Sequence, residues 1–307
     1  MNRHAARLTA QLLAGDRVDT PEAVVGRLLA VQAQDARGLR LAIRPRSTGV
    51  RASDVDAALT DRRSLIVTWL NRGTLHLVAA EDYWWLHSLT TPPLATGNAT
   101  RLRQEGVSPK DADKGVAVIQ REVSTRGPLT RSELRGALDV AGVPTAGQAL
   151  VHLLLAASLR GDLIRGPMRG SEQCFVAAAD WLGAAPEALD RGEALGRLAR
   201  RYLAGHGPAS PNDLAKWAGV TLGDARRGLA AISDETVEGD EGLLDLAERP
   251  APGPMPPPRL LGAFDPLLHG WVSREPVVGR HKGIVTTNGL FRPFAMVDGR
   301  AVATWGL

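Results

Sequence analysis

The chain has 307 residues, of which 44% are apolar, and its 37 basic and 33 acidic residues give a formal net charge of +4. This apolar share excludes a wholly disordered chain, and no run of about 18 uncharged apolar residues is present to form a membrane-spanning helix. The first residues are amphipathic and lack an apolar signal core, so we expect a cytoplasmic protein. One cysteine, Cys174, excludes an internal disulfide and a cysteine-rich zinc site.

Arginine carries almost all of the positive charge, since only four of the basic residues are lysines. The planar guanidinium group of arginine donates paired hydrogen bonds to phosphate groups and to guanine edges. A GC-rich genome also enriches arginine over lysine, so the composition permits nucleic-acid binding without establishing it.

The N-terminal third is predicted to contain three helices followed by a β-hairpin. The first helix covers about 2–14, and the second begins with a Thr-Pro-Glu start at Thr20. The third runs over about 53–62. Two strand-like segments, 64–70 and 74–80, flank an Asn-Arg-Gly turn. This hairpin would be the wing of a first winged helix.

An internal repeat occupies the middle of the chain, where RGPLTRSEL at 126–134 is matched by HGPASPNDL at 206–214. In both copies Gly-Pro ends one helix, and Thr130 or Ser210 caps the next, with an acid three residues later. An amphipathic helix precedes each copy, and a third helix and a candidate hairpin follow it. This order is the winged-helix plan, whose third helix normally enters the DNA major groove. The alternatives are three-helix units that do not bind DNA and winged helices that serve as protein-interaction modules.

The C-terminal residues change from helical to β patterns. A proline-rich linker covers 248–259, and Asn-Gly at 288 and Asp-Gly at 298 indicate hairpin turns. Because the sequence ends just after the last predicted strand, we expect a truncated β-unit. The predicted fold is mainly α with small β (α+β): three tandem winged-helix modules plus a C-terminal β-unit, at residues 1–95, 96–185, 186–250 and 251–307.

Gln32 and Gln34 are the first candidate catalytic residues. Residues two apart share a face in an extended segment and not in a helix, so the preceding helix would have to end near Val31. A bare Gln-x-Gln is a weak motif, and polar surface is its ordinary explanation. The adjacent Asp35 is either a general base or, pointing to the opposite face, a structural residue.

Thr74 and His76 lie on one face of a predicted strand. His76 could contact a DNA phosphate or the target sugar, with Thr74 as possible support. The alternative is a structural histidine whose hydrogen bonds are made within its own strand. No lysine lies near these segments, which argues against a Schiff base and favours water as the nucleophile. The sequence has neither zinc-type spacing of cysteine and histidine nor a glycine-rich phosphate loop, so we expect no metal and no cofactor.

Cationic residues after the Gln pair, around the predicted wings and beside the β-unit form a candidate DNA-contact set. Phosphate contacts position a duplex without reading its sequence, which suits an enzyme that scans for damage. A solvated side chain is the alternative for each member. The set is Arg37, Arg40, Arg44, Arg46, Arg72, Arg165, Arg169, Arg274, Arg280, His281 and Lys282.

Four segments together resemble one known family: RLLAVQAQDARGLRLAIRPR at 27–46, TWLNRGTLHLVAAEDYWWL at 68–86, LLGAFDPLLHGW at 260–271 and NGLFRPFAMVDGRAVATW at 288–305. Over nearly its whole length the chain is similar to the AlkZ/YcaQ-like winged-helix DNA glycosylases. The resemblance implies three winged helices and a β-unit around a C-shaped basic channel. It also implies excision of N7-alkylated purines and unhooking of interstrand cross-links, with the family's Gln-x-Gln signature falling on Gln32 and Gln34.

We therefore expect a monofunctional DNA glycosylase that binds double-stranded DNA as a monomer and is associated with the nucleoid. A neutral amide is a poor general base. N7 alkylation, however, makes the purine a good leaving group, so two amides that position water and stabilise the sugar cation suffice. One alternative is a non-catalytic winged-helix transcriptional regulator, which would usually be a dimer that reads spaced half-sites. The other is a protein-interaction scaffold without salt-dependent DNA affinity.

Overall fold

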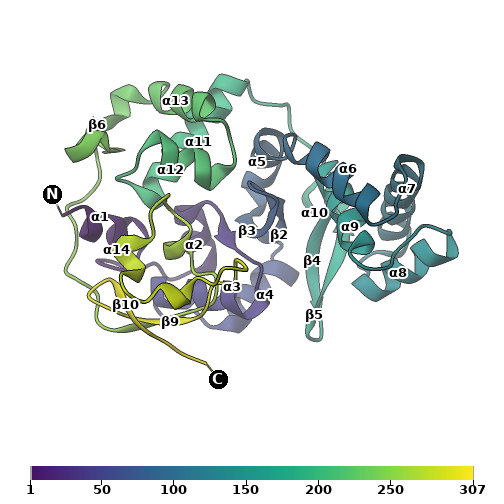
Figure 1. Ribbon diagram of the computed structural model, residues 1–307, viewed down its shortest axis with the longest axis horizontal. Helices are drawn as coiled ribbons and strands as arrows, with labels where there is room; N and C mark the ends of the chain where they lie inside the picture. The colour runs from purple at the N-terminus through teal and green to yellow at the C-terminus, as the bar shows by residue number, and fades with distance from the viewer. Residues whose placement is uncertain (1, 307) are drawn as a thin grey trace. The chain divides into compact units, whose positions relative to one another are not determined.

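The computed structural model describes residues 2–306, which fold as two compact units (Figure 1). The first unit combines the residues up to 55, residues 74–79 and the residues from 189 onward, and the second holds 56–73 and 80–188. Met1 and Leu307, the outer ends of the first and last predicted modules, lie outside the described residues. The division into four modules stays a prediction. Within 2–306, no helix is both long enough and apolar enough to cross a membrane.

Two distant stretches of sequence supply the helices of the first unit. The helix α11 (Arg191–His206) is central and packs against α13, α2 and α1. A Cβ atom at Gly205 would lie 2.5 Å from the carbonyl oxygen of Arg27, and one at Gly228 would lie 2.5 Å from that of Leu195. Glycine at these two positions therefore allows the close packing around α11. The other helices are α1 (Arg3–Ala10), α2 (Pro21–Leu28), α3 (Ala36–Ile43), α12 (Pro211–Ala218), α13 (Leu222–Ala230) and α14 (Glu275–Val278).

The strands of the first unit form short antiparallel pairs and one small sheet. β1 (Val31–Gln32) pairs with β3 (Thr74–Ala79), β6 (Thr236–Glu238) pairs with β7 (Leu244–Leu246), and β8 (Arg259–Leu261), β9 (Phe294–Val297) and β10 (Arg300–Thr304) form a sheet of order β10-β9-β8. The predicted Asp-Gly hairpin turn between β9 and β10 is confirmed, with positive φ at both residues. Around the predicted Asn-Gly turn at 288, the chain forms only an isolated antiparallel bridge between Val285 and Phe291. The last residue of the predicted linker begins β8.

The second unit packs helices against an antiparallel sheet of order β2-β4-β5. In β4 and β5, Leu163 lies opposite Ala177, and Arg165 lies opposite Val67 of β2. The helix α4 (Ala52–Thr60) runs from residues of the first unit into the second. The other elements are β2 (Leu65–Leu70), α5 (Tyr83–Thr90), α6 (Leu94–Gln104), α7 (Pro109–Arg126), α8 (Arg131–Val140), α9 (Ala149–Leu159), β4 (Leu163–Arg169), β5 (Glu172–Ala177) and α10 (Ala178–Leu182).

Both predicted capping boxes are confirmed. The Thr130 hydroxyl accepts from the Glu133 backbone N–H, and the Glu133 carboxylate accepts from the Thr130 backbone N–H at the start of α8. Ser210 and Asp213 make the same reciprocal pair at the start of α12. Each box satisfies two backbone donors that a helix start leaves without a partner.

The third helix of the second predicted module is largely enclosed by other elements of the second unit. α9 packs against α6, α7, β2 and β4, and each of its residues is buried or half-buried. Its sequence, ALVHLLLAASL, is apolar on nearly all sides, which is typical of a helix surrounded by protein. The winged-helix plan for residues 96–185 therefore stays a prediction, and the burial of α9 gives it no support.

His206 ends α11 in an aromatic cluster of the first unit. Its ring stacks on Tyr202 with 4.8 Å between centroids, and the centroid of Trp217 lies 5.1 Å away. The indole N–H of Trp271 donates to the His206 carbonyl oxygen at 2.9 Å. Burial lowers the pKa of His206 from 6.5 to about 3, so the folded protein holds this ring neutral.

We expect the free energy of unfolding to decrease as the pH falls below 6.5. The unfolded chain binds a proton at His206 there, and the folded chain does not until about pH 3. This group alone would remove up to ~1.4 kcal/mol per pH unit in that window. Urea unfolding at pH 7, 6 and 5 measures the slope, and His206→Phe should flatten it. An identical slope in that variant would contradict the assignment.

Candidate active site

The second helix ends before the two glutamines. α2 stops at Leu28, Leu29 turns the chain with a φ of +64°, and β1 begins at Val31. The antiparallel register sets Val31 opposite Leu77 and Gln32 opposite His76. The backbone N–H of Ala33 continues this pairing by donating to the Leu75 carbonyl oxygen at 2.8 Å. The expectation that Gln32 lies on an extended segment is thus confirmed.

Gln32, Thr74 and His76 come together in this strand pair. Gln32 is only 6% exposed, and the Thr74 hydroxyl donates to its Oε1 at 3.4 Å. Side chains of directly opposite residues point to the same face of a strand pair, so His76 lies beside Gln32. His76 Nδ1 lies 2.9 Å from the Thr74 carbonyl oxygen, which makes Nδ1 the donor and leaves the lone pair of a neutral ring on Nε2.

Gln34 and Asp35 occupy the bend between β1 and α3. The Gln34 side chain is exposed. Asp35 is the N-cap of α3, and its carboxylate accepts a hydrogen bond from the Gly38 backbone N–H. That carboxylate is therefore held at the positive end of the helix, which gives Asp35 a structural role.

The C-terminal part of the first unit packs against the start of α3. A Cβ atom at Gly38 would lie 2.5 Å from the Ala263 carbonyl oxygen, and one at Gly262 would lie 2.7 Å from Leu41 Cβ. Two glycines thus bring segment 262–264 against the helix that follows the glutamines. The last residue of this segment, Phe264, has a φ of +56°. This conformation is uncommon for a bulky residue, and such residues cluster at functional sites.

Phe264, His269 and Phe291 form an aromatic cluster next to α3. No motif in the sequence assigned chemistry to these residues. The centroids of His269 and Phe291 are 4.2 Å apart, and those of Phe264 and Phe291 are 5.4 Å apart. The Arg274 guanidinium lies 5.1 Å from the Phe291 ring centroid, and its Nε donates to the Leu268 carbonyl oxygen. The phenylalanines and histidine are half-buried. The only signal in the sequence was their position inside two of the family-like segments, and their proximity needs the fold.

Arg46 is a correction to the candidate DNA-contact set. Its side chain is fully buried, and its two terminal nitrogens donate to the two carboxylate oxygens of Asp265 at 2.9 and 2.7 Å. It also donates to Gln11 and to the Ala42 carbonyl oxygen. A guanidinium enclosed in this way cannot reach a phosphate group, so Arg46 is a core residue.

The other members of the set differ in exposure. In the second unit, Arg165 is half-buried, with its guanidinium 5.4 Å from the Trp69 ring centroid and 5.3 Å from that of Phe175, and burial lowers its pKa to about 10. It therefore remains charged at neutral pH. Arg169 is exposed and forms an ion pair with Glu133 at 2.9 Å. Arg37, Arg44, Arg280 and Lys282 are exposed, whereas Arg40, Arg72, Arg274 and His281 are half-buried.

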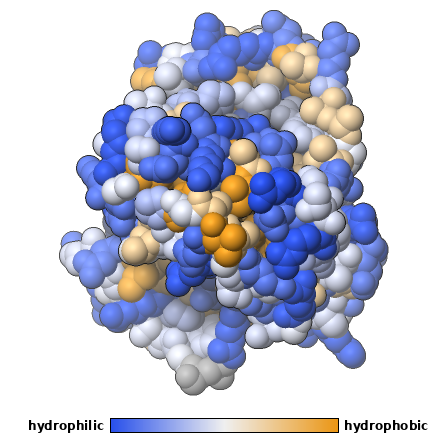
Figure 2. All heavy atoms as spheres, turned by 90° about the vertical axis from the view of Figure 1, so that its right-hand side faces the viewer, coloured by the Kyte–Doolittle hydropathy of each residue, from blue (hydrophilic) through white to orange (hydrophobic). Residues whose placement is uncertain are grey.

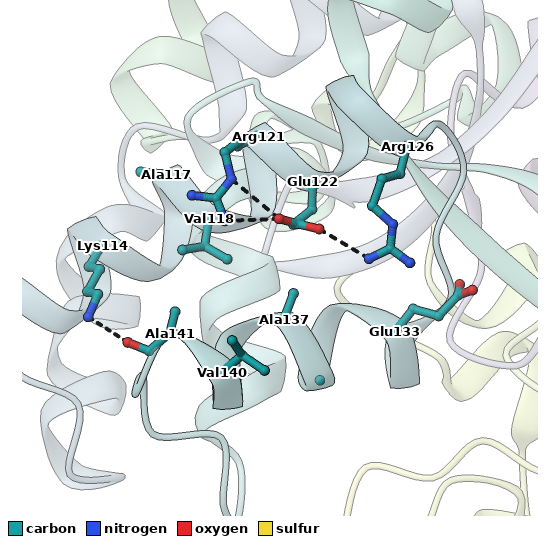
Figure 3. A pocket seen from close by; sticks show the side chains of 11 residues that line it. Lys114, Ala117, Val118, Arg121, Glu122, Arg126, Glu133, Ala137, Val140 and Ala141 are labelled. Carbon is teal, nitrogen blue, oxygen red and sulfur yellow. Dashed lines mark hydrogen bonds and ion pairs between the residues drawn. The ribbon is translucent and has the colours of Figure 1, made fainter.

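A hollow of about 980 Å³ in the second unit has a different character (Figure 3). It lies along α7 and α8, where apolar side chains gather at the centre of the surface and polar ones surround them (Figure 2). Val140 on its floor is 92% exposed. The Glu122 carboxylate binds both Arg121 and Arg126, at 2.9 and 3.1 Å. Because two carboxylates, those of Glu122 and Glu133, lie among its three cations, this hollow is less suited to phosphate than one lined by cations alone.

Comparison with known proteins identifies one family. Residues 25–307 match the family model described as DNA glycosylase AlkZ-like. An interstrand DNA cross-link repair glycosylase from Streptomyces sahachiroi is 29% identical over an alignment 323 positions long, which covers 98% of this chain and 86% of the relative. The solved structure of Streptomyces sahachiroi DNA glycosylase AlkZ matches with a TM-score of 0.80 and 27% identity, over 99% of this chain and 86% of the other.

These matches define an enzyme, a DNA glycosylase of mixed α+β fold, and do not favour the transcriptional-regulator alternative. The chain belongs to the AlkZ-like DNA glycosylase family.

Proposed function

We propose that this protein is a monofunctional glycosylase that hydrolyses the N-glycosidic bond of N7-alkylated purines in duplex DNA. We extend the proposal to interstrand cross-links, because the Streptomyces relative is named for their repair. The observation that carries it is the Gln32 amide, buried beside His76 and held by the Thr74 hydroxyl. We also infer that the protein acts as a monomer on chromosomal DNA in the cytoplasm, with tandem winged-helix modules that the repeated capping boxes support.

The chemistry suits two neutral amides. An N7-alkylated purine carries a positive charge, so it leaves with the electron pair of the glycosidic bond as a neutral base. The sugar left behind becomes an oxocarbenium ion, which the amide oxygens of Gln32 and Gln34 would stabilise through their fixed dipoles. The same oxygens would orient a water molecule toward C1′. Its oxygen forms the new bond, and its proton passes to solvent.

The segments that hold the glutamines, Thr74 and His76 contain no lysine that could form a covalent intermediate. The four lysines are Lys110, Lys114, Lys216 and Lys282, and all lie outside the segments 28–43 and 74–79 that build the site. A lyase-type glycosylase needs such an amine to form a Schiff base with the sugar. We therefore infer that the product is an abasic site with an uncut strand.

The aromatic cluster beside α3 supplies a surface for a nucleobase. Phe264, His269 and Phe291 are half-buried, so parts of their rings remain accessible. Stacking of a base on an aromatic ring is worth about 1–3 kcal/mol and tolerates different bases. Such a surface would accommodate altered purines without reading their identity.

The test is base release from alkylated duplex DNA. We expect the purified protein to release N7-methylguanine from methylated duplex while leaving the strand uncut until alkali is added. Liquid chromatography of the free base and a denaturing gel of the strand give the two readouts. Binding to the methylated duplex without any base release would overturn the enzymatic proposal, and cleavage before alkali would overturn its monofunctional form.

A further inference from the structure

A second hollow, of about 430 Å³, lies within the first unit, and one of the residues that line it, Arg44, belongs to the candidate DNA-contact set. Three arginines line it, and we call it the arginine pocket. Arg17 comes from the loop between α1 and α2, Arg44 follows α3, and Arg259 begins β8. Ser47 and Thr48 also line it. The fold thus brings three cations together from sequence positions up to 242 residues apart.

The arginine pocket has no counter-charge of its own. No aspartate or glutamate lines it, and the ion pairs within residues 2–306 do not involve its three arginines. This differs from the hollow on α7 and α8, where Glu122 lies between two arginines. Three like charges converging without an acid repel one another, so a bound anion would relieve the repulsion.

Hydrogen bonds to backbone carbonyl groups orient two of the three guanidinium groups, and most of their N–H donors make no hydrogen bond among the described residues. Arg17 donates one hydrogen bond to the Ser47 carbonyl oxygen at 3.3 Å, and Arg44 donates one to that of Val50 at 3.1 Å. Each guanidinium has five N–H donors. Arg259 Nε is shielded from solvent and has no hydrogen-bond partner. Burial and the charge of Arg17 lower the pKa of Arg259, which is the direction a nearby anion would reverse.

The carbonyl groups at the end of α3 do not oppose an anion strongly, because two of them are already bound. Arg46 donates to the Ala42 carbonyl oxygen, and the Ser47 hydroxyl donates to that of Ile43. These bonds reduce the negative potential that a helix C-terminus otherwise presents. The chemistry of the arginine pocket therefore favours a compact oxyanion, and forked guanidinium groups match phosphate in particular.

We propose that Arg17, Arg44 and Arg259 bind a phosphate group, and that its source is the backbone of the DNA substrate. This source rests on the proposed function. α3 begins directly after Gln34 and Asp35 and ends at the arginine pocket, and its eight residues span about 12 Å. At about 3.4 Å of rise per nucleotide, the bound phosphate lies roughly three to four nucleotides from the reacting one.

The test uses Arg17→Gln, Arg259→Gln protein and unmodified duplex DNA. We expect the affinity of the double variant for duplex DNA to be about tenfold lower than that of the wild type. The plot of the logarithm of the association constant against the logarithm of the salt concentration should have a slope shallower by about 1, as for one lost phosphate contact. Fluorescence anisotropy at several salt concentrations measures both. The single Arg17→Gln variant, whose side chain is exposed, should show part of the effect if the double variant folds poorly. Arg121→Gln is the matched control, because Arg121 is an exposed arginine of the second unit that pairs with Glu122.

A second arm separates DNA backbone from free phosphate. Thermal melting of the wild type and the double variant is compared in inorganic phosphate and in chloride of equal ionic strength. If phosphate stabilises only the wild type while the DNA slope stays unchanged, the pocket binds free phosphate and the backbone source is overturned. Unchanged DNA binding and no phosphate effect would overturn the site itself. The binding test uses unmodified duplex, from which no base is released. Its result can therefore be interpreted even if the glycosylase assay fails.

Discussion

The double variant Gln32→Ala, Gln34→Ala is expected to release N7-methylguanine at least about 100-fold more slowly than the wild type. Removing a preorganised group that stabilises a developing charge costs about 10²–10³ in rate, and this variant removes both amides. Stability should change little at the exposed Gln34 and moderately at Gln32, which is buried. Single-turnover release of the free base, with enzyme in excess, isolates the chemical step from product release.

Two further variants make that experiment specific. Gln120→Ala removes an exposed glutamine on α7 in the second unit and should retain full activity. Thr74→Val removes the hydroxyl that donates to Gln32 Oε1. Its rate of base release should lie between that of the wild type and that of the double Gln variant. If the double Gln variant keeps wild-type rates, the paired amides are polar surface and catalysis lies elsewhere.

Asp265→Asn is expected to lower the free energy of unfolding of the first unit by about 3–5 kcal/mol. Asp265 and Arg46 are both fully buried, and their ion pair has a closest distance of 2.7 Å. Removing one partner leaves a buried charge without compensation, which is far more costly than losing an ion pair in water. Urea unfolding followed by tryptophan fluorescence measures the change, since Trp217 and Trp271 lie in the first unit and four other tryptophans lie in the second.

Matched variants separate the burial of the charge from the loss of an ion pair. Glu241→Gln breaks the exposed pair between Arg3 and Glu241, whose side chains are 44% and 71% exposed, and should have little effect. Replacing both charges, as Arg46→Met, Asp265→Leu, should recover much of the loss, because no unpaired charge remains. Equal destabilisation by Asp265→Asn and Glu241→Gln would show that the buried pair contributes no more than a surface one.

The buried pair also bears on how the site is assembled. Asp265 directly follows Phe264, and Arg46 lies three residues after the end of α3. The two residues are 219 positions apart, and their contact joins the segment after the glutamines to the segment with the aromatic cluster. We infer that Asp265→Asn would also loosen the approach of Ala263 to Gly38, so its activity should be measured below its melting temperature.

Local patterns predicted those features whose cause lies within a few residues. The two capping boxes, the Asp-Gly turn between β9 and β10, and the end of α2 before Gln32 each depend on neighbouring residues. The pairing of Thr74 and His76 on one strand face also followed from a period of two. The Gln-x-Gln motif could be noticed in the sequence, but only resemblance to a family gave it weight.

Tertiary structure alone decided the burial of charged and aromatic side chains. Arg46 has the same local appearance as Arg44, yet one is a core residue and the other is exposed, because Asp265 packs against only one of them. The aromatic cluster and the third strand of the C-terminal sheet likewise join segments remote in sequence. Periodicity and capping act over one or two turns of chain, whereas the partner that buries a side chain is chosen by the fold.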